Sequence, residues 1–211
     1  PGPVISAMLH DSRVRKLSFT GSTAVGRRLL KEASDCVVNC SMELGGNAPF
    51  IVFEDADIDA AVDGAMIAKM RNGGEACTAA NRFYVHKAVH DAFAEKLAAK
   101  MKAVKLGEGW LPTTGCGPLV NEASLRKVEG FVEDAVARGA KVLTGGKALE
   151  RSGYFFPPTV LTGVAKDSAL LHDEIFGPVA ALVAFESEEE VIGLANDTEY
   201  GLVSYVYTRD L

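Results

Sequence analysis

Hydrophobic positions along the chain follow two different periods. Short apolar runs bounded by turn residues are typical of buried β-strands, and apolar residues spaced three or four apart are typical of amphipathic helices. The first pattern predicts strands at 16–20, 36–42, 49–53, 82–86, 141–143, 155–161, 179–185 and 204–207. The second predicts helices at 22–31, 57–70, 89–104, 122–138 and 188–196. This alternation predicts an α/β fold with a mostly parallel sheet flanked by helices, although the pattern does not give the strand order.

Local signals place the ends of several elements. Ser22 or Thr23 is suited to cap the helix after the first strand, because a hydroxyl accepts a hydrogen bond from the first helical turn. The Asn-Gly-Gly sequence at 72–74 is a strong helix stop. Cys77 then falls in a polar, glycine-rich segment between a helix and a strand, which we expect to be an exposed loop. Glu43 falls at a strand end, directly before Leu44 and two glycines.

The composition is that of a folded globular protein with a mild acidic excess. Of 211 residues, 48% are hydrophobic and 24% are charged, and the formal net charge is −6. This balance argues against the broad basic surface of a nucleic-acid-binding protein and favours a small-molecule partner. The longest uncharged stretches are too short to cross a bilayer, and the first residues lack an initiator Met and signal-peptide features. We therefore expect no membrane association and a chain that begins within a longer protein.

The four cysteines, Cys36, Cys40, Cys77 and Cys116, are too few and too irregularly spaced for a disulfide scaffold. No Cys/His spacing predicts a metal site, so we expect no metal and a reducing, cytoplasmic location. Cys36 and Cys40 alternate with apolar residues in the strand 36–42, and Cys116 lies in a loop without a candidate base nearby, so these three are interpreted as structural. Cys77 is the candidate nucleophile, because a reactive thiol must be reachable and partly ionised. A spectator thiol is the alternative.

Two further features are suited to chemistry. The turn at 21–26, with the sequence GSTAVG, places backbone N–H groups and a hydroxyl at a helix N-terminus, where a pyrophosphate is favoured. It is neither a Walker loop nor a complete dinucleotide fingerprint, and an ordinary capped turn is the alternative. Glu43, followed by glycines that let a ligand approach the backbone, is suited to act as a general base. Its alternative is an ordinary solvated carboxylate.

Four segments, taken together and in this order, resemble the NAD(P)-dependent aldehyde dehydrogenase superfamily. They are FTGST at 19–23 with Gly26, MELGGNAP at 42–49, Cys77, and EIFGP at 174–178. The resemblance spans essentially the whole chain. It implies the catalytic domain of that family, incomplete at its C-terminal side, over 45–211, and a remnant of its Rossmann-like cofactor domain over 1–44. Within the superfamily, GNAPFIVF at 46–53 and KMRN at 69–72 look like succinate-semialdehyde dehydrogenase.

The resemblance also implies a role for each matching residue. Cys77 is the nucleophile that attacks the aldehyde, its backbone N–H helps to hold the oxyanion, and Glu43 activates the water that hydrolyses the thioester. Hydride passes to the nicotinamide of NAD or NADP. The residues implied in cofactor binding are Gly21 and Ser22 at the pyrophosphate, Leu44 and Phe176 at the nicotinamide, and Glu174 at the ribose hydroxyls.

Arg71 matches an arginine that clamps the distal carboxylate of the substrate in the succinate-semialdehyde branch. A guanidinium suits this task because it binds a carboxylate through two parallel hydrogen bonds. A cation that complements the helix dipole is the alternative. Glu75 replaces the glutamine of many relatives, and Ala79 replaces the second cysteine of some, which removes a disulfide switch at that place.

The expected function is therefore oxidation of a small aldehyde, with succinate semialdehyde as the expected substrate, by a full-length enzyme that forms a homodimer or homotetramer. Two other hypotheses about the function stay open at this point. One is a catalytically silent α/β domain that lacks the cofactor half. The other is thioester or hydrolase chemistry at Cys77 without a nicotinamide.

Overall fold

The computed structural model describes residues 2–210. The chain divides into two compact units, one that ends at Gly45 and one that begins at Gly46. Each unit is described by itself.

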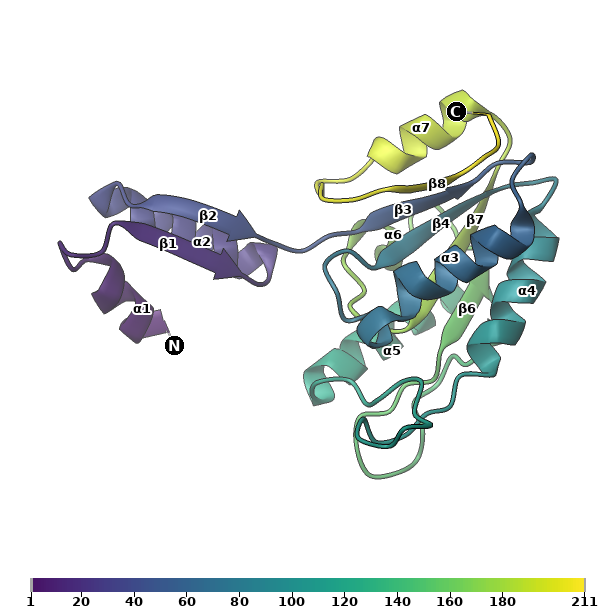
Figure 1. The fold of residues 1–211 in the computed structure, drawn as a ribbon, viewed down its shortest axis with the longest axis horizontal. Coiled ribbons are helices and arrows are strands. Elements are labelled where there is room, and N and C mark those ends of the chain that lie inside the picture. Colours follow the sequence, from purple (N-terminus) through teal and green to yellow (C-terminus); the bar gives the residue numbers. More distant parts are fainter. Residues whose placement is uncertain (1, 211) are drawn as a thin grey trace. The chain divides into compact units, whose positions relative to one another are not determined.

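The first unit is a parallel strand pair with helices (Figure 1). Its elements are α1 (Gly2–Leu9), β1 (Lys16–Thr20), α2 (Thr23–Ala33), a short 3₁₀ helix η1 (Ser34–Cys36) and β2 (Asn39–Glu43). The register places Lys16 opposite Asn39 and Thr20 opposite Glu43. Because a parallel pair needs a crossover, α2 connects the end of β1 to the start of β2.

The second expected strand is shorter than its apolar pattern indicates. The run 36–42 predicts a strand that includes Cys36, but Cys36 lies in η1 and is exposed, and β2 begins only at Asn39. Val37 has a left-handed backbone with φ of 53°. A β-branched residue rarely adopts this conformation, and it interrupts an extended strand. The structural role predicted for Cys36 is therefore wrong as far as it depended on a strand position.

The second unit is built on a six-stranded sheet with the strand order β5-β6-β7-β4-β3-β8. Its strands are β3 (Ala48–Val52), β4 (Ala80–His86), β5 (Lys141–Thr144), β6 (Thr159–Thr162), β7 (Val179–Phe185) and β8 (Tyr205–Tyr207). Its helices are α3 (Ile58–Met70), η2 (Arg71–Gly74), α4 (His90–Lys102), α5 (Glu122–Ala137), α6 (Ala169–His172) and α7 (Glu188–Asn196). Every pairing in this sheet is parallel except that between β5 and β6.

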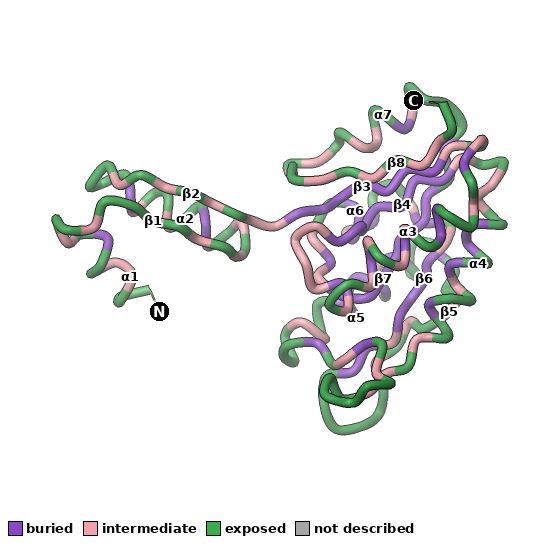
Figure 2. Tube along the Cα trace, in the orientation of Figure 1, coloured by how far each residue is buried: buried purple, intermediate pink, exposed green. Residues whose placement is uncertain are grey.

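Two hydrophobic clusters cover the two faces of this sheet. On β3, Phe50 and Val52 belong to the cluster that contains residues of α3 and α4, whereas Ile51 belongs to the cluster that contains residues of α5 and α7. Because successive side chains of a strand point to opposite faces, a strand covered on both faces is buried throughout. Figure 2 shows this burial along β3, β4 and β7. The predicted α/β sheet flanked by helices is confirmed.

Two strand predictions need correction. The run 155–161 predicts one strand, but β6 covers only Thr159–Thr162, because Pro157 and Pro158 have no N–H to donate to a neighbouring strand. The strand predicted at 141–143 is part of the alternating pattern that predicts a mostly parallel sheet. The observed β5 is antiparallel to β6, since the connection between them contains no helix that would make a crossover.

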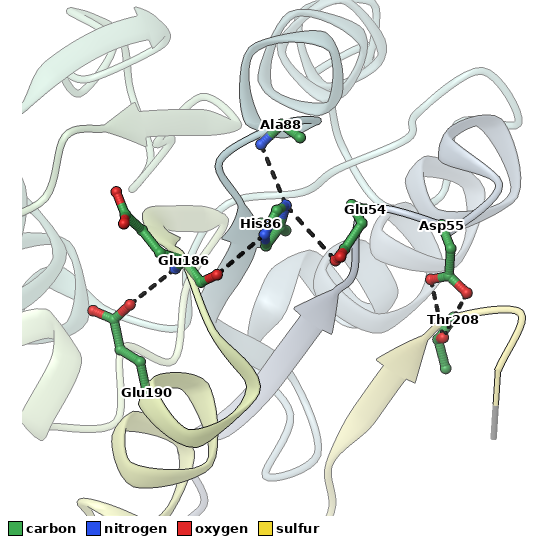
Figure 3. A network of polar contacts seen from close by, with 7 residues as sticks. All are labelled: Glu54, Asp55, His86, Ala88, Glu186, Glu190 and Thr208. Carbon is green, nitrogen blue, oxygen red and sulfur yellow. Dashed lines mark hydrogen bonds and ion pairs between the residues drawn. The ribbon is translucent and has the colours of Figure 1, made fainter.

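The carboxyl edge of the central strands is occupied by a polar network (Figure 3). His86, at the end of β4, lies 3.7 Å from the Glu54 carboxylate and 3.3 Å from the Glu186 carbonyl oxygen. Asp55 accepts hydrogen bonds from the Thr208 hydroxyl and from the backbone N–H of Arg209. This network connects the ends of β3, β4, β7 and β8. The candidate site residues of this unit precede the strands and therefore lie at the opposite, amino edge of the sheet.

Candidate active site

Three loops meet at the amino edge of β3, β4 and β7. A Cβ built on Gly46 would lie 2.2 Å from the carbonyl oxygen of Cys77, and one built on Gly74 would lie 2.2 Å from the carbonyl oxygen of Gly177. The Gly46 N–H donates a hydrogen bond of 3.1 Å to Oε1 of Glu174. Only glycine allows such close backbone contact, so the predicted helix stop and the glycines before β3 serve to bring these loops together.

The loop that carries Cys77, residues 71–79, follows α3 through three consecutive left-handed residues. Asn72, Gly73 and Gly74 have φ angles of 52°, 63° and 80°. The Asn72 side chain donates to the carbonyl oxygen of Glu75 at 2.9 Å, which closes the turn. The helix stop predicted at 72–74 is therefore correct in position.

Cys77 lies in the turn that follows and is half-buried, not exposed as its polar surroundings predict. Its carbonyl is covered by Gly46, and the next carbonyl, that of Thr78, accepts a hydrogen bond of 2.8 Å from the Tyr205 hydroxyl. The Cys77 backbone N–H has no hydrogen-bond partner within residues 2–210. Contacts to these two carbonyls thus fix the backbone that carries the thiol, and the Cys77 N–H beside it can donate a hydrogen bond to an anion.

Arg71 lies at the C-terminus of α3, where its charge complements the helix dipole. It also lines a cavity of about 280 Å³. The other residues of this cavity are Gly64, Ile67, Ala68, Ala76, Thr78, Tyr205 and Tyr207. The guanidinium has no hydrogen-bond or ion-pair partner in the described part of the chain. Arg71 is exposed and lies both at the end of α3 and on the wall of this cavity, so its role as a carboxylate clamp stays a prediction.

The two chain neighbours of Cys77, Ala76 and Thr78, lie in this same cavity. Gly64 allows Tyr207 to enter the cavity wall, because a Cβ at this position would lie 1.6 Å from the tyrosine hydroxyl. The cavity is thus mainly apolar, and Arg71 lines it together with residues of the loop that carries Cys77. Cys77 itself does not line this cavity; it lines a different, larger one, of about 580 Å³, together with Gly46, Arg82 and residues of α7 and of the segment between α7 and β8.

Glu174 and Phe176 belong to the loop that precedes β7. Glu174 is half-buried, and one of its carboxylate oxygens is occupied by the Gly46 N–H. Its carbonyl oxygen accepts a hydrogen bond of 2.6 Å from Lys127 of α5. Phe176 has a left-handed backbone with φ of 53°, an uncommon conformation for a bulky residue. Such local strain persists only where neighbouring contacts fix the loop.

The comparisons with known proteins give the family. The model of the aldehyde dehydrogenase family matches residues 2–211. This chain belongs to the aldehyde dehydrogenase family. It is 53% identical over its whole length to a glutarate-semialdehyde dehydrogenase of Pseudomonas putida, of which it covers 43%. It is 54% identical to a succinate-semialdehyde dehydrogenase of Paenarthrobacter nicotinovorans, with 96% of this chain and 45% of that protein covered.

Solved structures agree with this assignment. A crystal structure of succinate-semialdehyde dehydrogenase from Burkholderia pseudomallei is 52% identical and superimposes with a TM-score of 0.98, covering 100% of this chain and 44% of that one. The chain therefore spans less than half the length of the relatives that it matches. The sequence resemblance to this family is confirmed. In the described residues, no helix is long and apolar enough to cross a membrane.

The aldehyde dehydrogenase motif at 19–26 lies in the first unit. Ser22 caps α2, and its hydroxyl oxygen accepts a hydrogen bond of 3.4 Å from the Val25 N–H. The Gly21 N–H donates to the carbonyl oxygen of Glu43 at 3.0 Å. A Cβ on Gly26 would lie 2.4 Å from the Leu44 side chain, so α2 packs directly on this leucine. Gly21, Ser22, Glu43 and Leu44 are thus gathered at one end of the first unit.

Two titratable groups close to Cys77 have raised pKa values, which favours their neutral forms. They are Glu75, in the loop 71–79 (the thiol loop), and Cys116, which lies against it. Burial raises the pKa of the Glu75 carboxyl, although the Val120 N–H bound to it at 3.2 Å acts in the opposite direction. Burial raises the pKa of the Cys116 thiol to about 11, and the nearby Glu75 adds to this. A thiol that stays protonated is a poor nucleophile. The structural interpretation of Cys116 is supported.

Sequence reasoning missed three buried polar residues beside the site. They are Lys69, Asn81 and Arg82. Arg82 donates to the Asn47 carbonyl oxygen at 2.8 Å and to the Ala195 carbonyl oxygen at 3.0 Å, which joins the start of β3 to the end of α7. Helical spacing contains the signal for Lys69, which lies four residues after Ala65 and therefore on the buried face of α3. A lysine on an apolar stripe is a reason to look for a buried role.

Proposed function

We propose that the protein to which this chain belongs oxidises an aldehyde that carries a distal carboxylate to the corresponding acid, with NAD+ or NADP+ as oxidant and Cys77 as nucleophile. The observation that carries this proposal is that Arg71, which has no ion-pair partner within residues 2–210, lines an apolar cavity together with both chain neighbours of Cys77. On this proposal, 1–44 is the end of the cofactor domain and 45–211 is most of the catalytic domain.

The cavity favours one class of substrate. A short chain of methylene groups fits an apolar wall, and a terminal carboxylate gains charge-assisted hydrogen bonds from the guanidinium. These two relatives are named for substrates with this chemistry, because glutarate and succinate semialdehydes both carry a carboxylate at the end opposite the aldehyde. Succinate semialdehyde is the substrate we propose.

The residues of the chain account for the acyl chemistry. The Cys77 thiolate attacks the aldehyde carbon, and the free Cys77 N–H donates to the oxygen on which negative charge develops. Loss of hydride from the resulting thiohemiacetal leaves a thioester on the sulfur. Glu43, three residues before Gly46 in the chain, then takes a proton from the water that hydrolyses this thioester. The C–S bond breaks, the acid leaves and the Cys77 thiolate is restored.

The residues implied at the cofactor fit a dinucleotide. At the start of α2, Gly21 and Ser22 offer a pyrophosphate the positive end of an 11-residue helix, and the Ser22 hydroxyl proton stays available as a donor. Leu44 and Phe176 would flank the nicotinamide. The Glu174 carboxylate has Oε1 on the Gly46 N–H and no partner on Oε2 within residues 2–210, so Oε2 can accept from ribose hydroxyls. The cofactor, when bound, supplies the hydride acceptor.

Two further features complete the proposal. Relatives named as NADP(+)-dependent are among those matched, so either nicotinamide dinucleotide is a candidate oxidant. The four cysteines are all free, which suits a reducing compartment such as the cytoplasm. The full-length enzyme is proposed to be a homodimer or homotetramer.

The test is Arg71→Ala in the protein at the length of its relatives. Loss of a bidentate, charge-assisted contact of roughly 1.5–3 kcal/mol corresponds to a KM for succinate semialdehyde about 10- to 100-fold higher. The KM for butanal, which has no carboxylate, stays within about twofold because uniform apolar contacts are untouched. The measurement is absorbance of the reduced nicotinamide against aldehyde concentration.

Cys77→Ala is the matched inactive control and turns over neither aldehyde. An equal rise of KM for both aldehydes in Arg71→Ala would remove the substrate proposal. Product acid without reduction of the nicotinamide would favour hydrolase chemistry instead. Turnover retained in Cys77→Ala would remove the proposed nucleophile.

A further inference from the structure

Lys69, in the last turn of α3, is a buried lysine that the proposed chemistry does not use. Its side chain has no exposed surface. Its ammonium Nζ donates to Oδ1 of Asn81 at 2.7 Å and to the carbonyl oxygen of Gly177 at 3.1 Å. Both acceptors are neutral, and Nζ has no ion-pair partner within residues 2–210.

The Gly177 carbonyl that accepts from Lys69 is also the contact point of the thiol loop. Gly74 packs against this carbonyl so closely that a Cβ would lie 2.2 Å from its oxygen and 3.2 Å from the carbonyl oxygen of Lys69. Gly177 follows Glu174 by three residues, and Glu174 accepts from Gly46, which in turn covers the carbonyl of Cys77. Lys69 therefore fixes the point at which the Glu174 loop and the thiol loop touch.

The energetics argue against a space-filling role. An uncompensated buried charge costs several kcal/mol, and an apolar residue of similar volume is often as stable or more stable. Burial lowers the pKa of Lys69 to about 7, and the nearby Glu174 opposes this shift. Lys69 is unfavourable to bury, yet its Nζ donates to two oxygens on separate elements. A leucine or methionine cannot connect these elements in this way.

We propose that Lys69 is a positioning residue, which holds the loop 174–178 against the loop 71–79 and so sets the distance between the ribose-binding carboxylate and the nucleophilic sulfur. This inference rests on the proposed dehydrogenase function. Lys69 reaches no reacting atom; it acts through the Gly177 carbonyl and through Asn81 at the start of β4. The dependence of the reaction on this distance is steep, because a displacement of about 1 Å can cost on the order of 100-fold in rate.

The first test is hydrogen–deuterium exchange on the chain itself, which needs no turnover. In Lys69→Met, which keeps the length and loses the donors, we expect faster amide exchange in both 71–79 and 174–178 and unchanged exchange in α5 and α7. Lys96→Met is the matched control. Lys96 is exposed and pairs with Asp59, so its substitution leaves both loops unchanged.

The second test is steady-state kinetics in the protein at the length of its relatives. We expect Lys69→Met to raise the KM for the nicotinamide dinucleotide about tenfold and to lower kcat, with the KM for succinate semialdehyde within about twofold. A purely structural loss lowers the amount of active enzyme and moves none of these KM values. Absence of turnover in the wild type would refute the proposed function. The exchange experiment would still test the positioning role of Lys69, because it needs no turnover.

Asn81→Ala covers the case in which Lys69→Met does not fold. It removes one of the two acceptors and keeps the lysine, so we expect the same two loops to exchange faster, with a smaller change. Exchange in 71–79 and 174–178 that matches the wild type, in whichever variant folds, would overturn the positioning role. So would a folded Lys69→Met enzyme with wild-type KM for the dinucleotide and wild-type kcat.

Discussion

At the residue scale, identical side chains have different chemistry because their surroundings differ. Cys77 lies in the loop 71–79, and the thiol of Cys116 lies against Gly73 of the same loop. Cys77 lies half-buried in a turn with a free backbone N–H, whereas Cys116 is buried beside the Glu75 carboxylate. Burial and a neighbouring negative charge both disfavour a thiolate. Composition alone does not distinguish the two cysteines, but their environments do.

Thiol labelling tests the buried, protonated state of Cys116, with the exposed Cys36 as the reference. At pH 8, a pKa of about 11 leaves only about one thousandth of Cys116 as thiolate, so iodoacetamide labels it far more slowly than the exposed Cys36. Peptide mapping by mass spectrometry at successive times measures both rates in one sample. In denaturant the two rates converge. Equal rates in the folded chain would show that Cys116 is neither buried nor protonated as described.

At the element scale, short loops at strand ends carry the candidate site, and glycines set how closely these loops approach one another. Gly46 and Gly74 have no room for a Cβ, because backbone oxygens of Cys77 and Gly177 lie against them. The amino edge of the sheet holds these loops, while the carboxyl edge is filled by the network around His86 and Asp55 (Figure 3). The usual position for ligands in parallel sheets is the carboxyl edge, so this site departs from the general rule.

Gly46→Ala is expected to lower turnover by at least about tenfold, because two backbone segments must separate to admit a methyl group and the thiol moves with them. Gly193→Ala is the matched control. Gly193 lies inside α7 with nothing within 4 Å of its added Cβ, so alanine there raises the free energy of unfolding by roughly 0.5–1 kcal/mol. Circular dichroism and turnover measure the two effects. Wild-type turnover in Gly46→Ala would contradict the close contact.

At the scale of the whole molecule, burial of one charge makes stability depend on pH. The pKa of Lys69 falls from 10.5 to about 7 on folding. Between these values the unfolded chain binds the proton and the folded chain does not, so the contribution of Lys69 to the free energy of unfolding rises with pH across this window. Below about pH 7 both states are protonated and this gain is absent.

Lys69→Met removes this contribution. Relative to the wild type, we expect its free energy of unfolding to rise less steeply between pH 7 and pH 9, by up to about 1.4 kcal/mol per pH unit. Urea unfolding at pH 7, 8 and 9, followed by circular dichroism, gives the two slopes. Lys96→Met, which changes an exposed lysine, keeps the wild-type slope. Parallel slopes for Lys69→Met and the wild type would show that Lys69 is charged when folded throughout this range.

The sequence predicted much of the fold because periodicity and caps are local. The bounds of β1 and β7 and the extent of α7 agree with their apolar patterns, and Ser22 caps α2 as expected. Where a local conformation broke the pattern, prediction failed. The left-handed Val37 shortened β2, and two prolines shortened β6.

By itself, then, the sequence determined the α/β class, the family and the identity of the candidate nucleophile, because motifs and periods are properties of neighbouring residues. Only the tertiary structure decided which groups meet. The antiparallel pairing of β5, the half-buried state of Cys77, the cavity that Arg71 shares with the chain neighbours of Cys77 and the burial of Lys69 all depend on partners far along the chain. Burial and long-range contact set protonation and geometry, and neither can be read from adjacent residues.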